Sequence, residues 1–549
     1  MDFKKAVKDK KSELNDLYKR MDDDRNLINN AYILKDVNDR KVPNSISVTL
    51  NDLKVFAVNV ESSLGNASEQ VIVEFEDKNL DTAYIEDFIK AAMLAANNRL
   101  TRQGRFPINP FIDQQMCWRG RAAVRCLFRV ADGVLIPDIS LWDSRFTYYE
   151  MGQDGLGWGA FEGYRTKDLI LAEYPKANVK GKSGLVLDAW DKKINRVYVD
   201  GEKVKEQTNP YDYPPVVTQV VPMGSMLADD DEIKNRGESI FFLIRDLIPE
   251  LNRLVSIMQS LNLKALDNAL LWKTKDGAGQ LPDYEKLTKP GSITKAEIGG
   301  GDEPVSYGEL KREAYLLHQI IEQRIRWGTM EVVGVGDLPG PLSAVALIEI
   351  GEGRDQVFLP RLSARGLLKQ QLADMIIDQV LKSGESSVEI GTRGHKRSFQ
   401  TSKLKGEYEI QYKYFIKSPK VDVARFSMAA AAGDLIPDKA KRRDILQRED
   451  PEEDERQLRW EEAERLSPPV KMDRAVRSLL ELAKRGDKFA KHEADILSAY
   501  MGVTLKQMLE GNTSQVPKPE EAQKPQPLLP MFGGGGSSGR KPAQPIEEK

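Results

Sequence analysis

Residues 309–341 read ELKREAYLLHQIIEQRIRWGTMEVVGVGDLPGP, and this stretch organises the rest of the chain. Up to Trp327 the apolar residues recur at helical spacing among charged ones, which predicts an amphipathic helix. Its apolar positions are Leu310, Ala314, Leu317, Ile321 and Ile325. Beyond Trp327, glycines and prolines crowd among valines and leucines, and no regular helix can run through them. The stretch therefore predicts a helix that ends in an unusually apolar loop.

The segments on either side of this stretch also have helical patterns. Residues 342–384 begin with a possible cap at Ser343 and keep helical spacing, although Gly351, Gly353, Pro360 and Gly366 should bend the helix. Residues 231–271 predict another helix, and 272–307 read as a small insert with β-capable pieces between glycines and prolines. We expect two helices that flank a small insert, followed by the apolar loop and a long bent helix.

The remainder of the chain mixes helix and strand patterns. Residues 46–60 and 71–75 are strand-like, whereas 82–100 predict an alanine-rich helix. Residues 387–390 and 408–416 predict strands that return to the N-terminal sheet, although their pairing partners do not follow from the sequence. The expected fold class is α+β and mainly helical, with a helical region after residue 421.

Composition bounds the class of protein. The chain has 549 residues, and its formal net charge of -3 gives no basic surplus for tight wrapping of DNA. Cys117 and Cys126 are the only cysteines, which suits a reducing compartment and predicts two buried free thiols. The most apolar segment, 240–244, is cut by Arg245 and is far too short to span a membrane. Residues 512–549 are rich in Pro, Gly, Glu and Lys, and we expect a disordered tail.

In the order of these elements, the chain resembles the phage portal proteins, which form the head-to-tail connector ring. The segment YDYPPVVTQVVPMGS at 211–225 is similar to the strand and Gly-Ser turn before the first stem helix of that family. The resemblance implies a wing over 1–230, a first stem helix over 231–271, a clip over 272–307, a second stem helix over 308–327 and a tunnel loop over 328–341. It further implies a long kinked helix over 342–384, returning wing strands over 385–420 and a helical crown over 421–511.

The same resemblance implies a function without catalysis. The chain would form a homo-oligomeric ring, dodecameric in the particle, at one capsid vertex of a virion assembled in the bacterial cytoplasm. Double-stranded DNA would pass through its channel without sequence specificity during packaging and ejection. Its partners would be the large terminase subunit, head-to-tail adaptor and tail proteins, and the major capsid and scaffolding proteins, with no membrane and no cofactor.

Two other classes of function stay open, namely a nuclease or terminase-like packaging enzyme and a structural capsid or baseplate protein that never contacts DNA. The fragment Gly181-Lys182-Ser183 is not a phosphate-binding loop, because position 176 is Lys where that loop needs Gly. His318, His395 and His492 lack neighbours at the spacing of a zinc helix motif. We therefore expect no catalytic, cofactor or metal site.

Two sets of residues are candidates for contact with DNA. The tunnel loop would narrow the channel with Met330, Val332, Val333, Gly334, Val335, Gly336, Asp337 and Leu338. Possible basic residues of the channel or clip are Lys273, Lys275, Lys286, Lys289, Lys295, Arg324 and Arg326. The plainer alternatives are an ordinary surface loop for the first set and solvated charges paired with neighbours such as Glu322 for the second.

Overall fold

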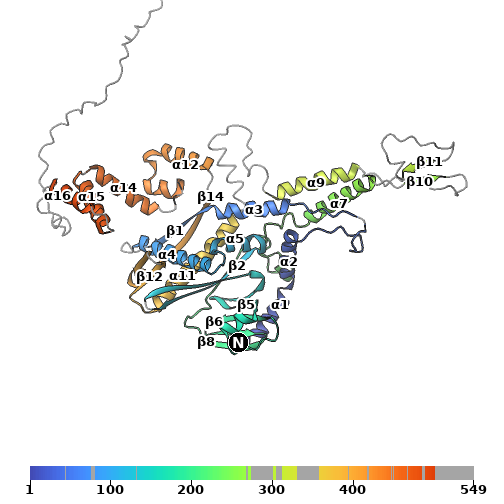
Figure 1. Cartoon of the computed structure of the whole chain (residues 1–549), viewed down its shortest axis with the longest axis horizontal. Helices are drawn as coiled ribbons and strands as arrows, with labels where there is room; N and C mark the ends of the chain where they lie inside the picture. The colour runs from blue at the N-terminus through green and yellow to red at the C-terminus, as the bar shows by residue number, and fades with distance from the viewer. Residues whose placement is uncertain are drawn as a thin grey trace, which may run out of the picture. The chain divides into compact units, whose positions relative to one another are not determined.

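The computed structural model describes residues 1–500 except 44, 76–80, 132, 267–269, 274–300, 305–311, 330–357, 393–394, 417–418, 447, 449–450, 467 and 485–488. The chain divides into two compact units, Met1–Glu452 and Glu453–Lys549. The first unit contains two five-stranded sheets and the helices that pack on them (Figure 1). The expected α+β class is confirmed.

The first sheet joins strands from distant parts of the sequence. Its order is β13-β12-β3-β2-β9, and only the β12–β3 pairing is parallel. The strands are β2 (Arg121–Ala131), β3 (Val134–Trp142), β9 (Val216–Val220), β12 (Ser387–Thr392) and β13 (His395–Gln400). Helices α4 (Thr82–Arg102) and α5 (Ile108–Arg119) pack on this sheet together with α11 (Leu359–Lys382), and they bury the largest core of the chain. The prediction that downstream strands return to the N-terminal sheet is confirmed for 387–390, whereas 408–416 pair with a different strand outside this sheet.

A separate two-stranded ribbon extends this packing. Strand β1 (Ala67–Phe75) pairs antiparallel with β14 (Tyr408–Ile416) along their whole length. Helix α11 packs against β14, and Gly366 lies at the closest approach, where an added Cβ would be 3.2 Å from the Tyr412 carbonyl oxygen. Pro360 occupies the first turn of α11, a position that proline tolerates. Neither residue interrupts the helix, which is continuous from Leu359 to Lys382. Residues 342–357 lie outside the described part.

The second sheet is a meander of neighbouring strands in the order β4-β5-β6-β7-β8. Its strands are β4 (Thr147–Gly152), β5 (Gly155–Thr166), β6 (Ser183–Asp191), β7 (Ile194–Val199) and β8 (Glu202–Thr208). The Asp200-Gly201 turn between β7 and β8 has φ values of 47° and 83°, as a tight hairpin needs. Helices α1 (Phe3–Glu13) and α2 (Asn15–Asn29) cover one side, where Phe3 and Leu17 join Tyr148 and Trp158 in a buried cluster.

Two expected elements differ from the structure. Residues 52–60, predicted as part of a strand, belong to helix α3 (Asp52–Gly65), whose buried face includes Leu53, Phe56 and Val60. Period-2 and period-3.6 patterns are easily confused in so short an apolar run. The helix expected from residue 231 begins at Leu247 as α7 (Leu247–Leu266), because η2 (Asp230–Asn235) and a turn with Gly237 at φ 68° come first.

The shorter elements and the second unit complete the description. The minor elements are η1 (Ser144–Phe146), α6 (Lys167–Glu173), η4 (Thr401–Leu404), α12 (Pro419–Ala431), η5 (Gly433–Leu435), α13 (Asp438–Ala440) and the π-helix η6 (Lys441–Ile445). In the C-terminal region, α14 (Pro451–Leu466) precedes α15 (Pro468–Lys484) and α16 (Ala490–Tyr500), which pack on one another through Val476, Ala490 and Ala494. The expectation of helices after residue 421 is confirmed up to residue 500, and the expected tail, 512–549, lies outside the described residues.

Candidate interface: the α7–α9 helical pair and its anchor

Helices α7 and α9 (Arg312–Gly328) form an antiparallel pair that extends from the first unit (Figure 1). Strands β10 (Leu270–Lys273) and β11 (Gly301–Pro304) pair antiparallel at one end. At the other end, an added Cβ on Gly328 would lie 2.6 Å from Ile244 Cγ2, so α9 returns to the start of α7. Ile321 and Ile325 of α9 are buried in one cluster with Ile248 and Leu251 of α7. Two helices therefore flank the predicted insert, most of which, 274–300 and 305–307, lies outside the described residues.

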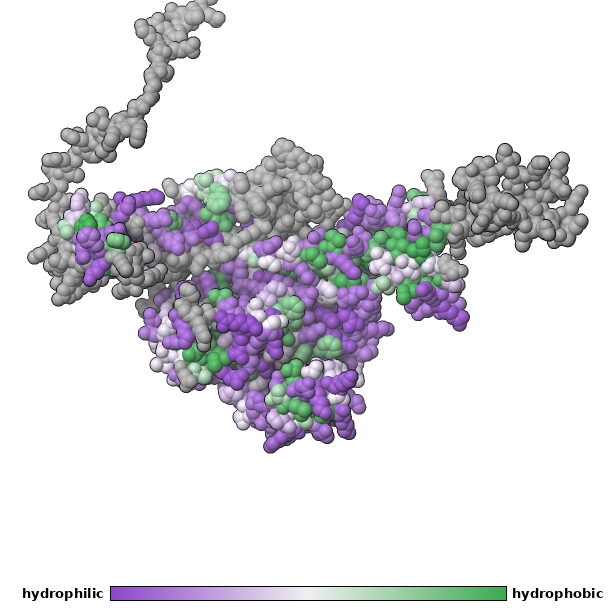
Figure 2. Space-filling view, viewed as in Figure 1, coloured by the Kyte–Doolittle hydropathy of each residue, from purple (hydrophilic) through white to green (hydrophobic). Residues whose placement is uncertain are grey.

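Helix α9 carries a second apolar stripe that no described residue of the chain covers. Leu316, Ile320 and Trp327 are 49%, 54% and 59% exposed. At about 100° per residue they lie on one side of the helix, about 140° from the buried pair Ile321 and Ile325. Figure 2 shows hydrophobic surface over this helical pair. A helix that packs on its own core needs one apolar stripe, so the second stripe of α9 is available for contact with another surface.

The charges predicted on α9 are engaged locally. Arg326 forms an ion pair with Glu322 at 2.7 Å, one helical turn away. The guanidinium of Arg324 lies 4.7 Å from the ring centre of Trp327, so this cation covers part of the apolar stripe. For Arg326, the alternative of a solvated charge paired with Glu322 is the observed arrangement.

Of the other candidate residues, the structure describes Lys273 alone. Lys273 ends strand β10. Lys275, Lys286, Lys289 and Lys295 lie outside the described residues, as do the tunnel-loop residues Met330, Val332, Val333, Gly334, Val335, Gly336, Asp337 and Leu338.

An extended segment, residues 45–50, runs along the polar side of α7, and we call it the strap. The backbone amides of Ile46, Val48 and Leu50 donate to Ser260 Oγ, Ser256 Oγ and Asn252 Oδ1 at 2.9, 2.8 and 3.0 Å. Alternate residues of an extended chain advance about 6.6 Å, and four helical residues advance about 6 Å, so the two sets stay in register. This segment has a strand-like sequence pattern, but its backbone amides bond to side chains of a helix and not to a neighbouring strand.

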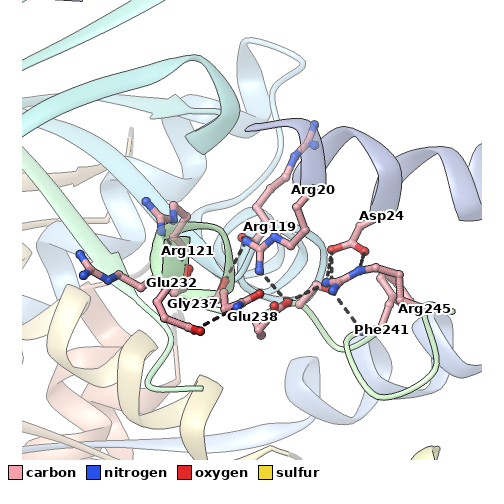
Figure 3. Close-up of polar contacts among 12 residues, drawn as sticks. Arg20, Asp24, Arg119, Arg121, Glu232, Gly237, Glu238, Phe241 and Arg245 are labelled. Atoms are coloured by element: carbon pink, nitrogen blue, oxygen red, sulfur yellow. Dashed lines mark hydrogen bonds and ion pairs between the residues drawn. The ribbon is translucent and has the colours of Figure 1, made fainter. Parts of the chain in front are cut away.

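A buried charge cluster holds the start of α7 and is called the junction below (Figure 3). Arg20 of α2 donates to Glu238 at 2.6 Å and to the Gly237 carbonyl at 3.1 Å. Arg245 donates to the same Glu238 at 2.6 Å and to Asp24 at 2.5 Å. Arg20, Asp24 and Glu238 are all buried, so each charge depends on its partners.

The pKa directions in the junction follow from how the carboxylates are shared. Burial lowers the pKa of Arg20, and the attraction of Glu238 does not fully offset it. Burial acts in the same direction on Arg245, but hydrogen bonds to Asp24 and Glu238 raise its pKa above the usual value. Both guanidiniums stay charged at neutral pH, and removal of one carboxylate would strand a buried cation.

Two glycines allow the backbones to meet at the junction. Gly120 ends α5 with φ 72°, and an added Cβ there would lie 1.7 Å from the Gly237 carbonyl oxygen. Gly237 has φ 68°, and its own Cβ would meet Val220 Cγ1 at 2.5 Å. Both positions need the left-handed region and the absence of a side chain.

A second charge cluster anchors α11. Arg365 binds Asp113 of α5 at 2.9 Å, and Lys369 binds Glu69 of β1 at 2.5 Å. Tyr414 of β14 donates to Glu69 at 3.2 Å. Burial raises the pKa of Asp113 despite Arg365 and lowers that of Lys369 despite Glu69. These charges come from three elements far apart in sequence, and no local pattern in the sequence indicated them.

Only faint signals of the junction exist in the sequence. Arg245 interrupts an apolar run, and Asp24 closes a run of aspartates that reads as a polar surface.

The predicted free thiols Cys117 and Cys126 are buried and unpaired with each other, and burial raises both pKa values. Within the described residues, no group of three or more His, Cys, Asp or Glu side chains could hold a metal ion. None of the helices described is long and apolar enough to cross a membrane.

The comparisons with known proteins found a distant structural likeness and no related sequence. No family model and no curated protein matches the chain. The chain is similar to a protein in the neck of an empty GTA particle with C6 symmetry, at 13% identity over 71% of this chain and 88% of that one, with a TM-score of 0.36. For the neck of the native GTA particle with C12 symmetry, the identity is 14%, the coverage 71% and 88%, and the TM-score 0.35. For the virion of the native gene transfer agent particle, these values are 14%, 71% and 87%, and 0.35. A likeness of this size assigns neither a family nor a function to this chain.

Proposed function

We propose that this chain is a portal protein, which forms the ring at one capsid vertex through which double-stranded DNA is packaged and ejected. The observation that carries the proposal is the antiparallel α7–α9 pair with its uncovered apolar stripe of Leu316, Ile320 and Trp327. The order of elements around this pair supports it, because a strand and a Gly-Ser turn precede α7 and a small strand pair separates the two helices.

An uncovered stripe on a projecting helix favours contact between copies of the chain. The buried stripe already packs α9 on α7, so the outer stripe has no remaining role within the described part of the chain. When one copy presents this stripe to a different surface of the next, the contact is head-to-tail, and such contacts close into rings when the rotation permits. The ring would be dodecameric in the particle.

In such a ring, the loop 328–341, the clip and the wing would each have a separate role. The loop 328–341 would narrow the channel with apolar side chains, which touch DNA without the phosphate affinity that slows sliding. The clip would bind the large terminase subunit during packaging and adaptor or tail proteins afterwards, while capsid and scaffolding proteins would surround the wing. The chain would perform no catalysis and would reside in the virion.

Negative-stain microscopy and native mass measurement of the full-length protein test this proposal. We expect rings with a central hole of duplex width. The double variant Leu316→Glu/Ile320→Glu should yield smaller species, since both side chains are half-exposed and their replacement leaves the core intact. Gln319→Glu is the matched control, because this exposed residue lies about 80° from the stripe.

The outcomes separate the classes of function. A monomer at all salt concentrations would overturn the ring. Closed particles without a central hole would favour the capsid or baseplate alternative. If the double variant forms rings like those of the wild type, the apolar stripe of α9 is not the contact that assembles the ring.

A further inference from the structure

A cavity of about 380 Å³ lies between the second sheet and α11, away from the α7–α9 pair. Its lining comes from the β4–β5 turn, the residue Lys192 between β6 and β7, the segment 212–218 and one side of α11. This volume is within the usual range for sites that hold a small ligand or a single anchoring side chain, about 300–1,000 Å³.

One side of the cavity is a hydrocarbon wall. Leu156, Val216 and Met375 line it, and Met151 stands at its edge with 57% exposure. Apolar walls of this kind accommodate methylene groups and not a hydrated ion. An acidic surface patch alone would lack this apolar wall.

The polar side of the cavity carries carboxylates whose charges are only partly balanced. Asp378 accepts from the Tyr213 hydroxyl at 2.8 Å and pairs with Lys382 at 3.1 Å. Asp374 lies one helical turn earlier on the same side of α11, and within the described residues it makes no hydrogen bond or ion pair. Lys192 is the one basic residue in the lining, which also contains Asp154 and Asp212. The cavity therefore has the volume and the excess negative charge to accept one more cation.

The surroundings of Asp374 disfavour the charged form of its carboxyl group. Burial, and to a lesser extent the charge of Glu409, raise the pKa of Asp374 to about 6. A cation beside this carboxylate would stabilise its charged form.

We propose that this cavity binds an alkyl cation, in which a guanidinium or ammonium group meets Asp374 while its methylene stem lies on Leu156, Val216 and Met375. The chemistry fits an arginine or lysine side chain of a protein partner, and it fits a free polyamine equally.

The test uses full-length protein and saturation-transfer NMR with N-acetyl-arginine methylamide, spermidine and the neutral arginine isostere N-acetyl-citrulline methylamide. We expect saturation of the arginine methylenes and a Kd for the citrulline compound about tenfold higher, the value of one charged hydrogen bond. Asp374→Asn should weaken arginine binding by a similar factor. Gln371→Arg, which places a guanidinium in the cavity lining, should abolish it. Asp168→Asn, an exposed residue of α6 outside the cavity, is the matched control and should bind as the wild type does.

Each outcome has a defined reading. Spermidine that binds more than tenfold tighter than the arginine compound would support the site and identify a free polyamine as its ligand. Comparable binding would support the site and identify a basic side chain. Equal binding of arginine and citrulline compounds, unaltered binding by the two cavity variants, or no binding of any probe would overturn the proposal.

Discussion

The hydrogen bonds between the strap and α7 give a prediction that can be measured at a single amide. Ser256 is fully buried, and its Oγ accepts from the Val48 amide at 2.8 Å while it donates to the Asn252 carbonyl at 2.7 Å. In Ser256→Ala the Val48 amide loses its acceptor, and no other side chain on that turn of α7 replaces it. The strap should open locally without unfolding of the helix.

The magnitude follows from the surroundings of this amide. A buried donor without a partner costs about 1–3 kcal/mol, and Val48 is half-buried, which places the cost near the lower limit of about 1 kcal/mol. Alanine favours the helix over serine by a few tenths of a kcal/mol, so α7 itself should persist. A loss of about 1 kcal/mol corresponds to an opening equilibrium constant for the strap that is about five times larger.

Hydrogen–deuterium exchange with residue-level mass spectrometry measures this opening. We expect the amides of Ile46, Val48 and Leu50 to exchange about fivefold faster in Ser256→Ala while amides within α7 keep their protection. Ser62→Ala is the matched control, since Ser62 is an exposed serine of helix α3. Unchanged exchange at Val48 in the Ser256→Ala protein would show that the hydrogen bonds to α7 do not hold the strap.

Three further changes test the junction and the α11 carboxylate. Arg20→Met should lower the free energy of unfolding in urea by about 3 kcal/mol, because Glu238 and the Gly237 carbonyl lose a buried donor; a change under about 0.5 kcal/mol would contradict a buried role. Gly120→Ala should prevent soluble expression, since its Cβ would lie 1.7 Å from the Gly237 carbonyl oxygen at φ 72°; a soluble protein with wild-type Tm would refute the close approach. The pKa of Asp374 is raised from 3.8 to about 6, so its carboxylate reduces stability increasingly as pH rises from about 4 to above 6. Asp374→Asn should therefore raise Tm at pH 7 and leave it unchanged at pH 3, and the opposite order would refute the sign.

Local patterns in the sequence determined several elements. The alternation at 71–75 predicted part of β1, and the alanine-rich run at 82–100 predicted α4 almost to its ends. The stripe of Ile321 and Ile325 predicted the buried face of α9. These features depend on the spacing of neighbouring side chains, which is a property of the sequence itself.

Contacts between distant residues were decided by the tertiary structure alone. The strap reads as a strand, yet its amides bind Asn252, Ser256 and Ser260 more than 200 residues later. Arg20 finds Glu238 across a similar separation, and the turn that this pair stabilises delays the start of α7 to Leu247. Polar residues such as these resemble surface positions in a sequence, because the same side chain suits water or a buried partner. Which of the two it meets depends on the packing of the whole fold, since a buried charge is tolerated only where distant elements bring its partners to it.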